Sequence, residues 1–266
     1  MKNILVLIEN DICFRHFMMN DTFKKLCENF NVKFVFPEEK NKRISSCKIK
    51  NQYFNSKVTR LFQNKIRVMI WKYLLYIDQI RFRFGKQNKV IRKQRMFTLG
   101  WKAYLIFKIL GLPIIWFFVK KILFNLLKNY EYDELLYLLK SWKPNIIIHP
   151  CTLDSIYLND LIFYTINTEA KVLAIMNSWD NPSTKNTVYK KPHKLLVWGK
   201  QTSDHAKEYM GLEKQEIEIF GSAQFDLYTK KSKLNKKKFN QIYKVNNETI
   251  LLYAGSSKGT NEISHL

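Results

Sequence analysis

Short apolar segments alternate with longer segments of helical spacing along most of this 266-residue chain. The apolar segments lie at residues 2–9, 32–36, 145–149, 171–176, 194–198 and 216–220. The segments with helical spacing lie at residues 14–30, 132–142, 154–168 and 201–210. Continuous apolar strands separated by helices are typical of a parallel sheet that helices cover on both faces. The chain is therefore predicted to be an α/β protein with a Rossmann-like parallel sheet.

Residues that start or stop helices and strands set the expected boundaries. Pro37 closes the second apolar segment, and Pro150 is expected to stop the strand at 145–149. Asp154 is expected to cap the helix at 154–168, and Gly211 to end the helix at 201–210. In a parallel sheet the carboxyl ends of the strands share one edge, and ligands bind there.

Positive charge is concentrated in one region of the chain. The formal net charge is +23, and residues 40–128 contain 22 Lys and Arg against one acidic residue, Asp78. We predict that this region is a largely helical insertion into the sheet domain. It also contains a mostly apolar run at residues 103–119, which is interrupted by Lys108, Gly111 and Pro113.

The apolar run at 103–119 has three interpretations. It has the minimum length of a transmembrane span, and it also fits a buried helical hairpin that breaks at Gly111-Leu112-Pro113. We favour an interfacial element, in which apolar side chains enter the bilayer boundary while Lys and Arg contact anionic lipid. An anionic membrane surface is therefore an expected partner.

Basic and aromatic residues together also fit nucleic-acid binding, but no RRM, KH, helix-turn-helix or zinc-finger pattern accompanies them, so nucleic acid is disfavoured.

The four cysteines, Cys13, Cys27, Cys47 and Cys151, show neither a CxxC spacing nor a histidine at metal-ligand spacing. Neither a zinc site nor a disulfide framework is predicted from them. A reducing, cytoplasmic setting fits this usage.

Polar side chains follow three of the predicted strands, where a ligand site is expected. They are Glu9, Asn10, Asp11, Arg15 and His16 after the first strand, His149 at the end of the strand at 145–149, and Ser178, Asp180 and Asn181 after the strand at 171–176. Structural roles compete with functional ones at these positions. Asp180 precedes Asn-Pro and fits a turn, His149 fits a satisfied core histidine, and Arg15 and His16 fit helix capping and packing.

The best-matched motifs of the chain lie between residues 171 and 226. They are Ser178-Trp179-Asp180-Asn181 with Thr184 and Lys185, then Val197-Trp198-Gly199, then Gly221-Ser222 and Gln224-Phe225-Asp226. Their order resembles the end of the first domain in GT-B glycosyltransferases, particularly the bacterial surface-polysaccharide group related to the CDP-glycerol glycerophosphotransferases. The resemblance covers about the last third of the chain in motifs and the N-terminal half in topology.

The resemblance implies a glycosyltransferase that moves a sugar from a nucleotide-sugar donor to a lipid-linked or cell-surface glycan acceptor, with no cofactor. Inverting transfer needs a base for the acceptor hydroxyl, and the order of preference is Asp180, His149 and Asp11. The substrate-binding residues implied are Arg15, His16, Ser178, Asn181, Thr184 and Lys185. No Asp-x-Asp pair occurs, so a metal-free site is expected, and the absence of GxSxG disfavours a serine hydrolase.

The same resemblance implies a division of the chain. We expect an N-terminal acceptor-side domain at 1–228, a linker at 229–248, and the first strand and turn of a donor-binding domain at 249–266. Gly255, Ser256, Ser257 and Lys258 would then belong to the diphosphate site, or simply form a strand-to-helix turn. We expect the 266-residue chain by itself to have no transferase activity.

Other functions remain open for the same residues. Two enzymes of the same architecture are alternatives, a CDP-glycerol-type glycerophosphotransferase and a UDP-N-acetylglucosamine 2-epimerase. A non-catalytic basic module that binds lipid or nucleic acid is an alternative of another class. The expected location is cytoplasmic, on the inner face of the plasma membrane.

Overall fold

The computed structural model describes residues 1–37, 58–61, 64–81, 89–179, 181–185, 187–229, 234–245 and 249. Met1–Leu227 form one compact unit, and Tyr228–Leu266 form a second. The second unit contains helix α12 (Lys236–Tyr243), whose N-cap is Asn235. Part of the expected linker at 229–248 is therefore helical.

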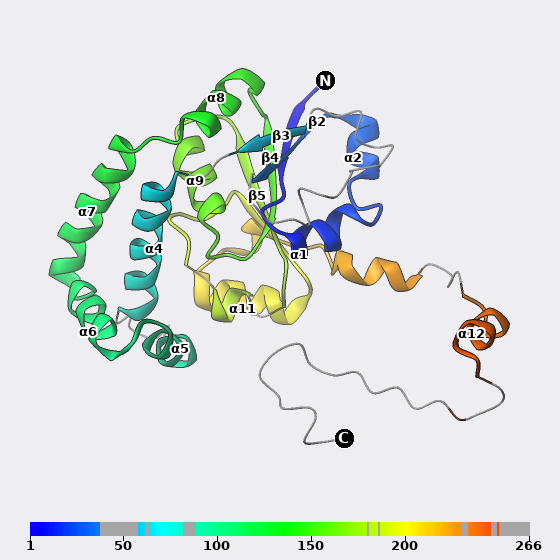
Figure 1. The fold of residues 1–266 in the computed structure, drawn as a ribbon. Helices are drawn as coiled ribbons and strands as arrows, with labels where there is room; N and C mark the ends of the chain where they lie inside the picture. The colour runs from blue at the N-terminus through cyan, green and yellow to red at the C-terminus, as the bar shows by residue number, and fades with distance from the viewer. Residues whose placement is uncertain are drawn as a thin grey trace. The chain divides into compact units, whose positions relative to one another are not determined.

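A seven-stranded sheet runs through the described part of the first unit, and every neighbouring pair in it is parallel (Figure 1). Its strands are β1 (Asn3–Leu7), β2 (Asn31–Pro37), β3 (Val58–Leu61), β4 (Ile146–Cys151), β5 (Lys171–Met176), β6 (Lys194–Val197) and β7 (Ile217–Ile219). They are ordered β3-β2-β1-β4-β5-β6-β7, which is the order of a Rossmann-like sheet. The predicted Rossmann-like parallel sheet is confirmed.

Strand β1 lies in the middle of the sheet and is buried on both faces. Leu5 and Leu7 pack into the core formed with α8 (Asp133–Trp142) and α9 (Ile156–Thr165). Ile4, Val6 and Ile8 pack into a second core on the other face, with Phe17, Phe23 and Phe34. This alternation explains why the strand reads as a continuous apolar run rather than as alternating polar and apolar residues.

The segment predicted as one helix at 14–30 is broken in the structure. It contains a π-helical turn η1 (Phe14–Met18) and α2 (Lys24–Asn29), and α1 (Asp11–Cys13) precedes it directly. The Asn20 side chain accepts hydrogen bonds from the Thr22 backbone and hydroxyl and donates to the carbonyl oxygen of His16. Such side-chain bonds compete with helical ones, so the prediction of a continuous helix was wrong.

Two predicted boundaries around β4 were also wrong. The strand continues through Pro150 to Cys151, because both residues keep their register with Ile175 and Met176 of β5. The cap of α9 is Ser155 rather than Asp154, since the Ser155 hydroxyl accepts from the Leu158 amide. The Asp154 carboxylate lies 3.7 Å from the Arg95 guanidinium instead.

The remaining helical segments of the sheet domain follow β5 to β7. They are α10 (Asn181–Thr184), α11 (Lys200–Met210), and the 3-10 turns η2 (Lys214–Glu216) and η3 (Ala223–Thr229). As predicted, α11 ends at Gly211, which has a left-handed backbone with φ of 64°.

Most of the described residues of the basic region from Lys65 onwards are helical. Its helices are α4 (Lys65–Ile80), α5 (Lys89–Leu99), α6 (Trp101–Leu110) and α7 (Pro113–Asn129). The region also contributes β3 to the sheet, where β3 pairs with β2. The sheet therefore extends into the span expected to be an insertion, while residues 40–57 lie outside the described part.

A buried ion pair attaches these helices to the sheet domain. Arg67 of α4 donates from Nε to Asp160 of α9 at 2.6 Å, and both side chains are 1% exposed. Trp71 donates to the same Asp160 oxygen at 2.6 Å. Arg67 also donates to the carbonyl oxygen of Tyr130 at 2.8 Å, so it links α4, α9 and the end of α7.

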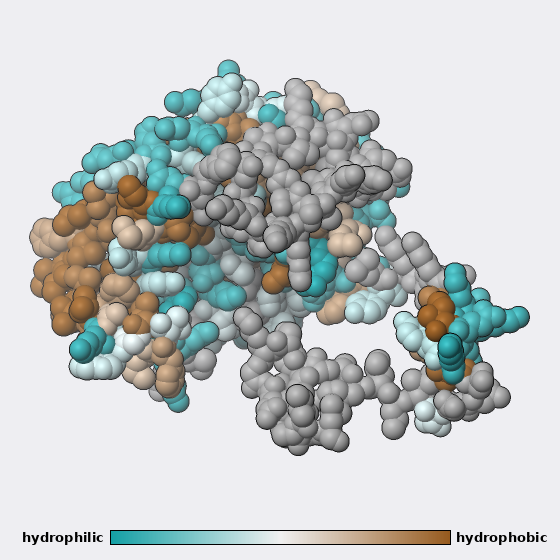
Figure 2. Space-filling view, viewed as in Figure 1, coloured by the Kyte–Doolittle hydropathy of each residue, from teal (hydrophilic) through white to brown (hydrophobic). Residues whose placement is uncertain are grey.

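Helices α6 and α7 form a hairpin that exposes a broad apolar surface (Figure 2). Its exposed large apolar side chains are Trp101, Leu105, Ile106, Ile109, Leu112, Ile114, Ile115, Phe117, Phe118 and Ile122. We refer to them as the hairpin face. Among the described residues, no helix combines the length and the hydropathy needed to cross a bilayer.

Candidate functional site

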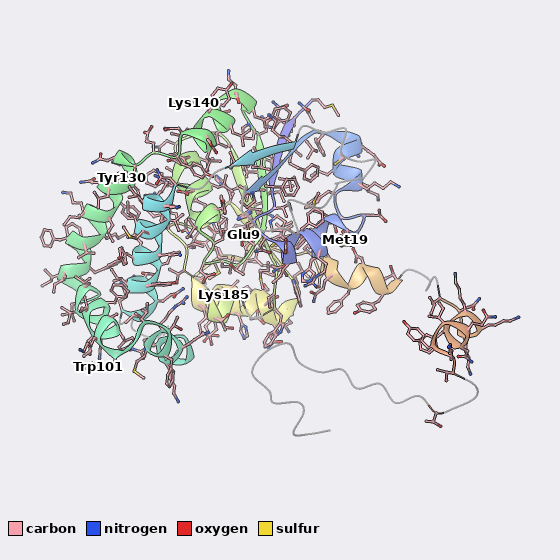
Figure 3. The ribbon with its side chains drawn as sticks, viewed as in Figure 1. Glu9, Met19, Trp101, Tyr130, Lys140 and Lys185 are labelled. Carbon is pink, nitrogen blue, oxygen red and sulfur yellow. The ribbon has the colours of Figure 1, made fainter. Side chains whose placement is uncertain are left out.

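Polar side chains meet where β1 and β4 lie next to each other and end. The chain leaves these two adjacent strands in different directions, because β1 leads to β2 on one side and β4 leads to β5 on the other. Open parallel sheets bind ligands at such a switch point. Glu9 lies at this end of the sheet, whereas Lys140 lies at the opposite end (Figure 3).

Glu9, Ser155 and His149 form a hydrogen-bonded cluster at the switch point. The Ser155 hydroxyl donates to Glu9 Oε2 and lies 3.2 Å from His149 Nε2. The same histidine nitrogen is 3.5 Å from Glu9 Oε2. His149 is fully buried, while 11% of the Glu9 side chain is exposed. Of the three, Glu9 and not His149 is accessible to a ligand.

The backbone fixes the orientation of the His149 ring. His149 Nδ1 lies 2.8 Å from the carbonyl oxygen of Leu7. Because a carbonyl oxygen only accepts, Nδ1 carries the proton in this contact. His149 was the second candidate for the base. Its direct contacts are those of a core histidine whose hydrogen bonds are satisfied. Any catalytic role of His149 therefore has to act through Ser155 and Glu9.

A second contact joins the first helical turns to the end of β5. His16 Nδ1 is 3.1 Å from the Asn177 side-chain oxygen, and Asn20 of the same segment donates to the carbonyl oxygen of Ala223 at 2.8 Å. Burial lowers the pKa of His16, the bond to Asn177 opposes this, and Arg15 lowers it further. His16 is thus held beside Asn177, which directly follows β5.

Asp11 and Arg15 also lie beside the switch point. Asn10 caps α1 by accepting from the amides of Ile12 and Cys13. Asp11 Oδ1 is buried and has no hydrogen-bond partner among the described residues. Arg15 is exposed. The two helical turns after β1 therefore carry a carboxylate, on α1, and an exposed guanidinium, on η1.

The loop after β5 is described in part. Ser178, Thr184 and Lys185 are half-buried, and Trp179 is 57% exposed. Lys185 lies at the same end of the sheet as Glu9 (Figure 3). Asn181 begins α10, but its side chain, like Asp180 as a whole, lies outside the described residues. The donor-site residues Gly255, Ser256, Ser257 and Lys258 lie outside them as well.

Two buried cysteines near Glu9 are poor nucleophiles. Burial, and then the negative charge of Glu9, raises the pKa of the Cys13 and Cys151 thiols well above the usual value. Both remain thiols at neutral pH, and only thiolates react readily. The described residues contain no group of three or more His, Cys, Asp or Glu side chains suited to a metal ion.

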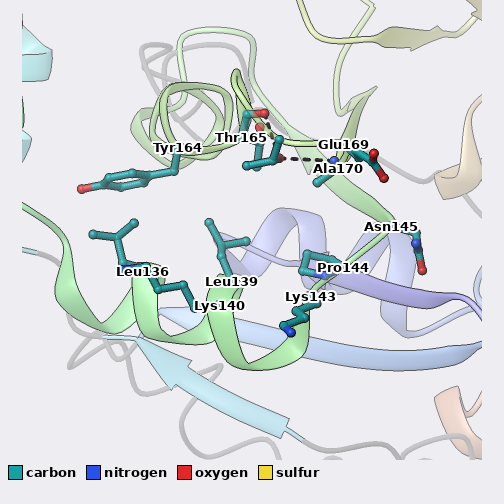
Figure 4. Close-up of a pocket in the computed structure, with 11 residues that line it drawn as sticks. Leu136, Leu139, Lys140, Lys143, Pro144, Asn145, Tyr164, Thr165, Glu169 and Ala170 are labelled. Atoms are coloured by element: carbon teal, nitrogen blue, oxygen red, sulfur yellow. Dashed lines mark hydrogen bonds between the residues drawn. The ribbon is translucent and has the colours of Figure 1, made fainter.

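A hollow of about 550 Å³ opens at the opposite end of the sheet (Figure 4). It lies between α8, the end of α9 and the segment that enters β5. Thr165 and Thr168 on its wall already make hydrogen bonds within the chain. Because it lies at the amino ends of β4 and β5, it is not the ligand site expected for this sheet.

The sequence-based site omitted Ser155 and Asn177. Ser155 was hidden because Asp154 offered an equally good cap one residue earlier. Asn177 directly follows β5, so the rule of strand ends selects it as readily as Ser178. Glu9 was noted at a strand end but not chosen as a site residue, since nothing local distinguishes it from a solvated surface glutamate.

Comparison with known proteins adds no identification, because neither a protein-family model nor a curated protein matches the chain.

Proposed function

We propose that the chain is the acceptor-side part of a membrane-associated GT-B glycosyltransferase, which moves a sugar from a nucleotide-sugar donor to a lipid-linked or surface glycan. The observation that carries the proposal is the chemistry of the switch point. It presents Glu9, Asp11 and His16 at the carboxyl ends of a Rossmann-like sheet. The motifs between Ser178 and Asp226 give independent support through their resemblance to this group.

The loop after β1 suits a hydroxyl acceptor better than a diphosphate. In dinucleotide-binding sheets a glycine-rich turn follows the first strand and lets the pyrophosphate approach the backbone. Here Glu9-Asn10-Asp11 follows instead, and two carboxylates repel a diphosphate. Carboxylates accept hydrogen bonds from sugar hydroxyls, so this end of the sheet is assigned to the acceptor and a second domain to the donor.

The proposed reaction is a direct displacement. The acceptor oxygen forms a bond to the anomeric carbon, and the bond from that carbon to the diphosphate breaks. A base must take the acceptor proton. The predicted bases Asp180, Asp11 and His149 all lie in the sequence at or just after strands that end at this edge of the sheet. The proposed contacts to the acceptor are Arg15, His16, Ser178, Asn181, Thr184 and Lys185.

A lipid-linked acceptor requires the enzyme to reach a membrane surface, and the hairpin face supplies such a contact. Its apolar side chains are accompanied by the exposed Lys102, Lys108, Lys121 and Lys128, and residues 101–129 contain no Asp or Glu. Apolar insertion and attraction to anionic headgroups act together in interfacial helices, with about 1 kcal/mol for each basic residue near the surface.

Transfer is tested with the full-length protein and vesicles that contain an undecaprenyl-diphosphate-linked sugar. Radiolabelled UDP-glucose, UDP-N-acetylglucosamine and CDP-glycerol are supplied separately, and label in the lipid fraction is counted. We expect transfer from a UDP-sugar. Transfer from CDP-glycerol alone would favour the glycerophosphotransferase, and conversion of UDP-N-acetylglucosamine without an acceptor would favour the epimerase.

A variant of the first-choice base accompanies this assay. If Asp180 removes the acceptor proton, Asp180→Asn lowers kcat about 100-fold or more and leaves donor affinity little changed. Absence of any turnover, together with salt-sensitive binding to generic polyanions, would support the non-catalytic basic module instead.

Membrane docking is tested by co-sedimentation with vesicles of phosphatidylcholine alone or mixed with phosphatidylglycerol. Replacing Ile114, Phe117 and Phe118 by serine should weaken binding to both vesicle types at least about tenfold, because insertion of each side chain contributes on the order of 1 kcal/mol. Replacing Lys102, Lys108 and Lys121 by glutamine should remove only the preference for phosphatidylglycerol. Tyr137→Ser, at a 75% exposed position of α8, is the control. Equal binding of the unaltered protein to both vesicle types would rule out the electrostatic part.

A further inference from the structure

We infer that Glu9, Ser155 and His149 form a proton relay, in which Glu9 is the base that faces the acceptor hydroxyl and His149 stores the proton. The inference rests on the proposed transferase function. It assigns the catalytic contact to Glu9, and it makes Ser155 and His149 positioning residues that act through Glu9.

The geometry provides a continuous path from the surface to the core. Glu9 is the partly exposed member of the cluster, the Ser155 hydroxyl contacts both of the others, and His149 is fully buried. Glu9 Oε1 is held by the Asn10 side-chain amide at 3.2 Å. The Oε2 atom is therefore the oxygen that communicates with Ser155.

The number of hydrogens in the cluster leaves room for one more proton. His149 Nδ1–H is used by the Leu7 carbonyl, so Nε2 of the neutral ring is an acceptor. The Ser155 oxygen already accepts from the Leu158 amide at 3.2 Å. Its single hydrogen therefore faces two acceptors, Glu9 Oε2 and His149 Nε2. One added proton satisfies both contacts.

Proton transfer through the cluster follows from this count. The acceptor hydroxyl gives its proton to Glu9 while its oxygen bonds to the transferred group. Glu9 passes a proton to the Ser155 oxygen, and Ser155 passes its own hydrogen to His149 Nε2. Glu9 is then a carboxylate again, Ser155 is unchanged, and His149 carries the proton until it is released by the same path.

Other titratable groups surround the cluster. Asp11 and Cys13 lie on α1, and Cys151 and Asp154 lie in the segment from β4 to α9. Both thiols have a raised pKa, through burial and then through the charge of Glu9. Asp154 faces Arg95, which makes it a suitable control carboxylate outside the hydrogen-bonded chain.

The relay is tested first without any substrate. Histidine labelled with ¹⁵N is introduced into the full-length protein, and the His149 signals are assigned by comparison with His149→Gln. We expect Nδ1 to stay protonated across the titration, and Nε2 to take up its proton at a lower pH in Glu9→Gln than in the unaltered protein. Asp154→Asn should leave that midpoint in place. Identical His149 titration in Glu9→Gln and the unaltered protein would overturn the relay.

The kinetic arm uses the vesicle assay with the donor that supports transfer. Glu9→Gln should lower kcat about 100-fold or more with little change in KM. Ser155→Gly removes the hydroxyl but keeps most of the capping energy, so the variant should stay folded. It should show both a lower kcat and an altered dependence of kcat on pH. Ser155→Thr keeps the hydroxyl and should show the same pH dependence as the unaltered protein. A fully active Glu9→Gln, or a larger loss in Asp180→Asn than in Glu9→Gln, would overturn the assignment of Glu9 as the base.

The two arms separate the relay from the proposed function. Coupled titration of His149 and Glu9 without transfer of any label contradicts the transferase but preserves the proton-sharing cluster. Transfer of label with uncoupled titration preserves the transferase and overturns the relay.

Discussion

The end of the sheet and the α6–α7 hairpin distribute their side chains in opposite ways. At the end of the sheet, polar groups such as His149 and Ser155 are buried and hydrogen-bonded to one another. On the hairpin, large apolar groups such as Phe117 and Ile114 are exposed, at 65% and 76%. Each arrangement costs stability unless a partner satisfies it.

Under the proposed function, the difference separates two kinds of role within one compact unit. Buried polar groups have their partners inside the chain, which makes them suited to hold a fixed geometry for chemistry. Exposed apolar groups leave their surface open to a partner outside the chain, which makes them suited to docking. Mutations should accordingly affect folding strongly at buried polar sites and weakly on the hairpin face.

The largest expected effect is on the ion pair that attaches the helices to the sheet domain. Arg67→Ala leaves Asp160 buried without its cation and should lower the free energy of unfolding by about 3–5 kcal/mol. Lys207→Ala is the control, because Lys207 pairs with Asp204 at 3.2 Å where both side chains are well exposed. It should cost less than about 1 kcal/mol. Urea denaturation measures both, and similar losses would contradict the importance of burial.

A somewhat smaller effect is expected where the hairpin meets α4. A Cβ added at Gly111 would lie 2.7 Å from Cβ and 3.1 Å from Cα of Arg81. Gly111→Ala should therefore cost about 1–3 kcal/mol through overpacking. At Gly199 an added Cβ meets no atom within 4 Å, so Gly199→Ala should cost less. Thermal unfolding that ranks the two variants in the reverse order would show that the hairpin is not packed closely on α4.

The ion pair also predicts a dependence of stability on pH. Burial raises the pKa of Asp160 to about 6, although Arg67 and the bond from Trp71 lower it. An unfolded aspartate has a pKa of about 3.9, so the folded state binds more protons between about pH 4 and pH 6. The stability contributed by protonated Asp160 is full below about pH 4 and is lost as the pH rises through about 6, with a slope of at most about 1.4 kcal/mol per pH unit.

Asp160→Asn should remove this slope from the urea unfolding free energies measured between pH 4 and pH 7. Asp204→Asn, at an exposed position, should retain it. An unchanged slope in Asp160→Asn would assign the pH dependence to other groups.

The smallest effect on folding is expected for the hairpin face. Phe117→Ser and Phe118→Ser remove apolar groups that are already 65% and 58% exposed, so the free energy of unfolding should change by less than about 0.5 kcal/mol for each. Their vesicle binding should nevertheless fall. Strong destabilisation without lipid would indicate that the hairpin face packs against the protein itself.

Local patterns predicted much of the fold. Apolar runs located β1, β2 and β4 to β7, and Gly111-Leu112-Pro113 located the break between α6 and α7, because proline cannot continue a helix from the preceding turn. The break at Asn20 was not predicted, since its cause is a set of side-chain bonds whose competition with the helix depends on the surrounding packing. The continuation of β4 through Pro150 depends on pairing with β5, which no local pattern records.

The sequence by itself determined where most of the strands and helices lie, because side-chain periodicity and the backbone limits of glycine and proline act over a few residues. Only the tertiary structure brought Ser155 to Glu9, 146 residues away, and His149 to the backbone of Leu7, 142 residues away. The same holds for Arg67 and Asp160, 93 residues apart, and for the exposure of the hairpin face. The sequence pattern of a helix with one apolar stripe is the same whether that stripe contacts a core or solvent. Burial and long-range contacts were therefore decided by packing alone.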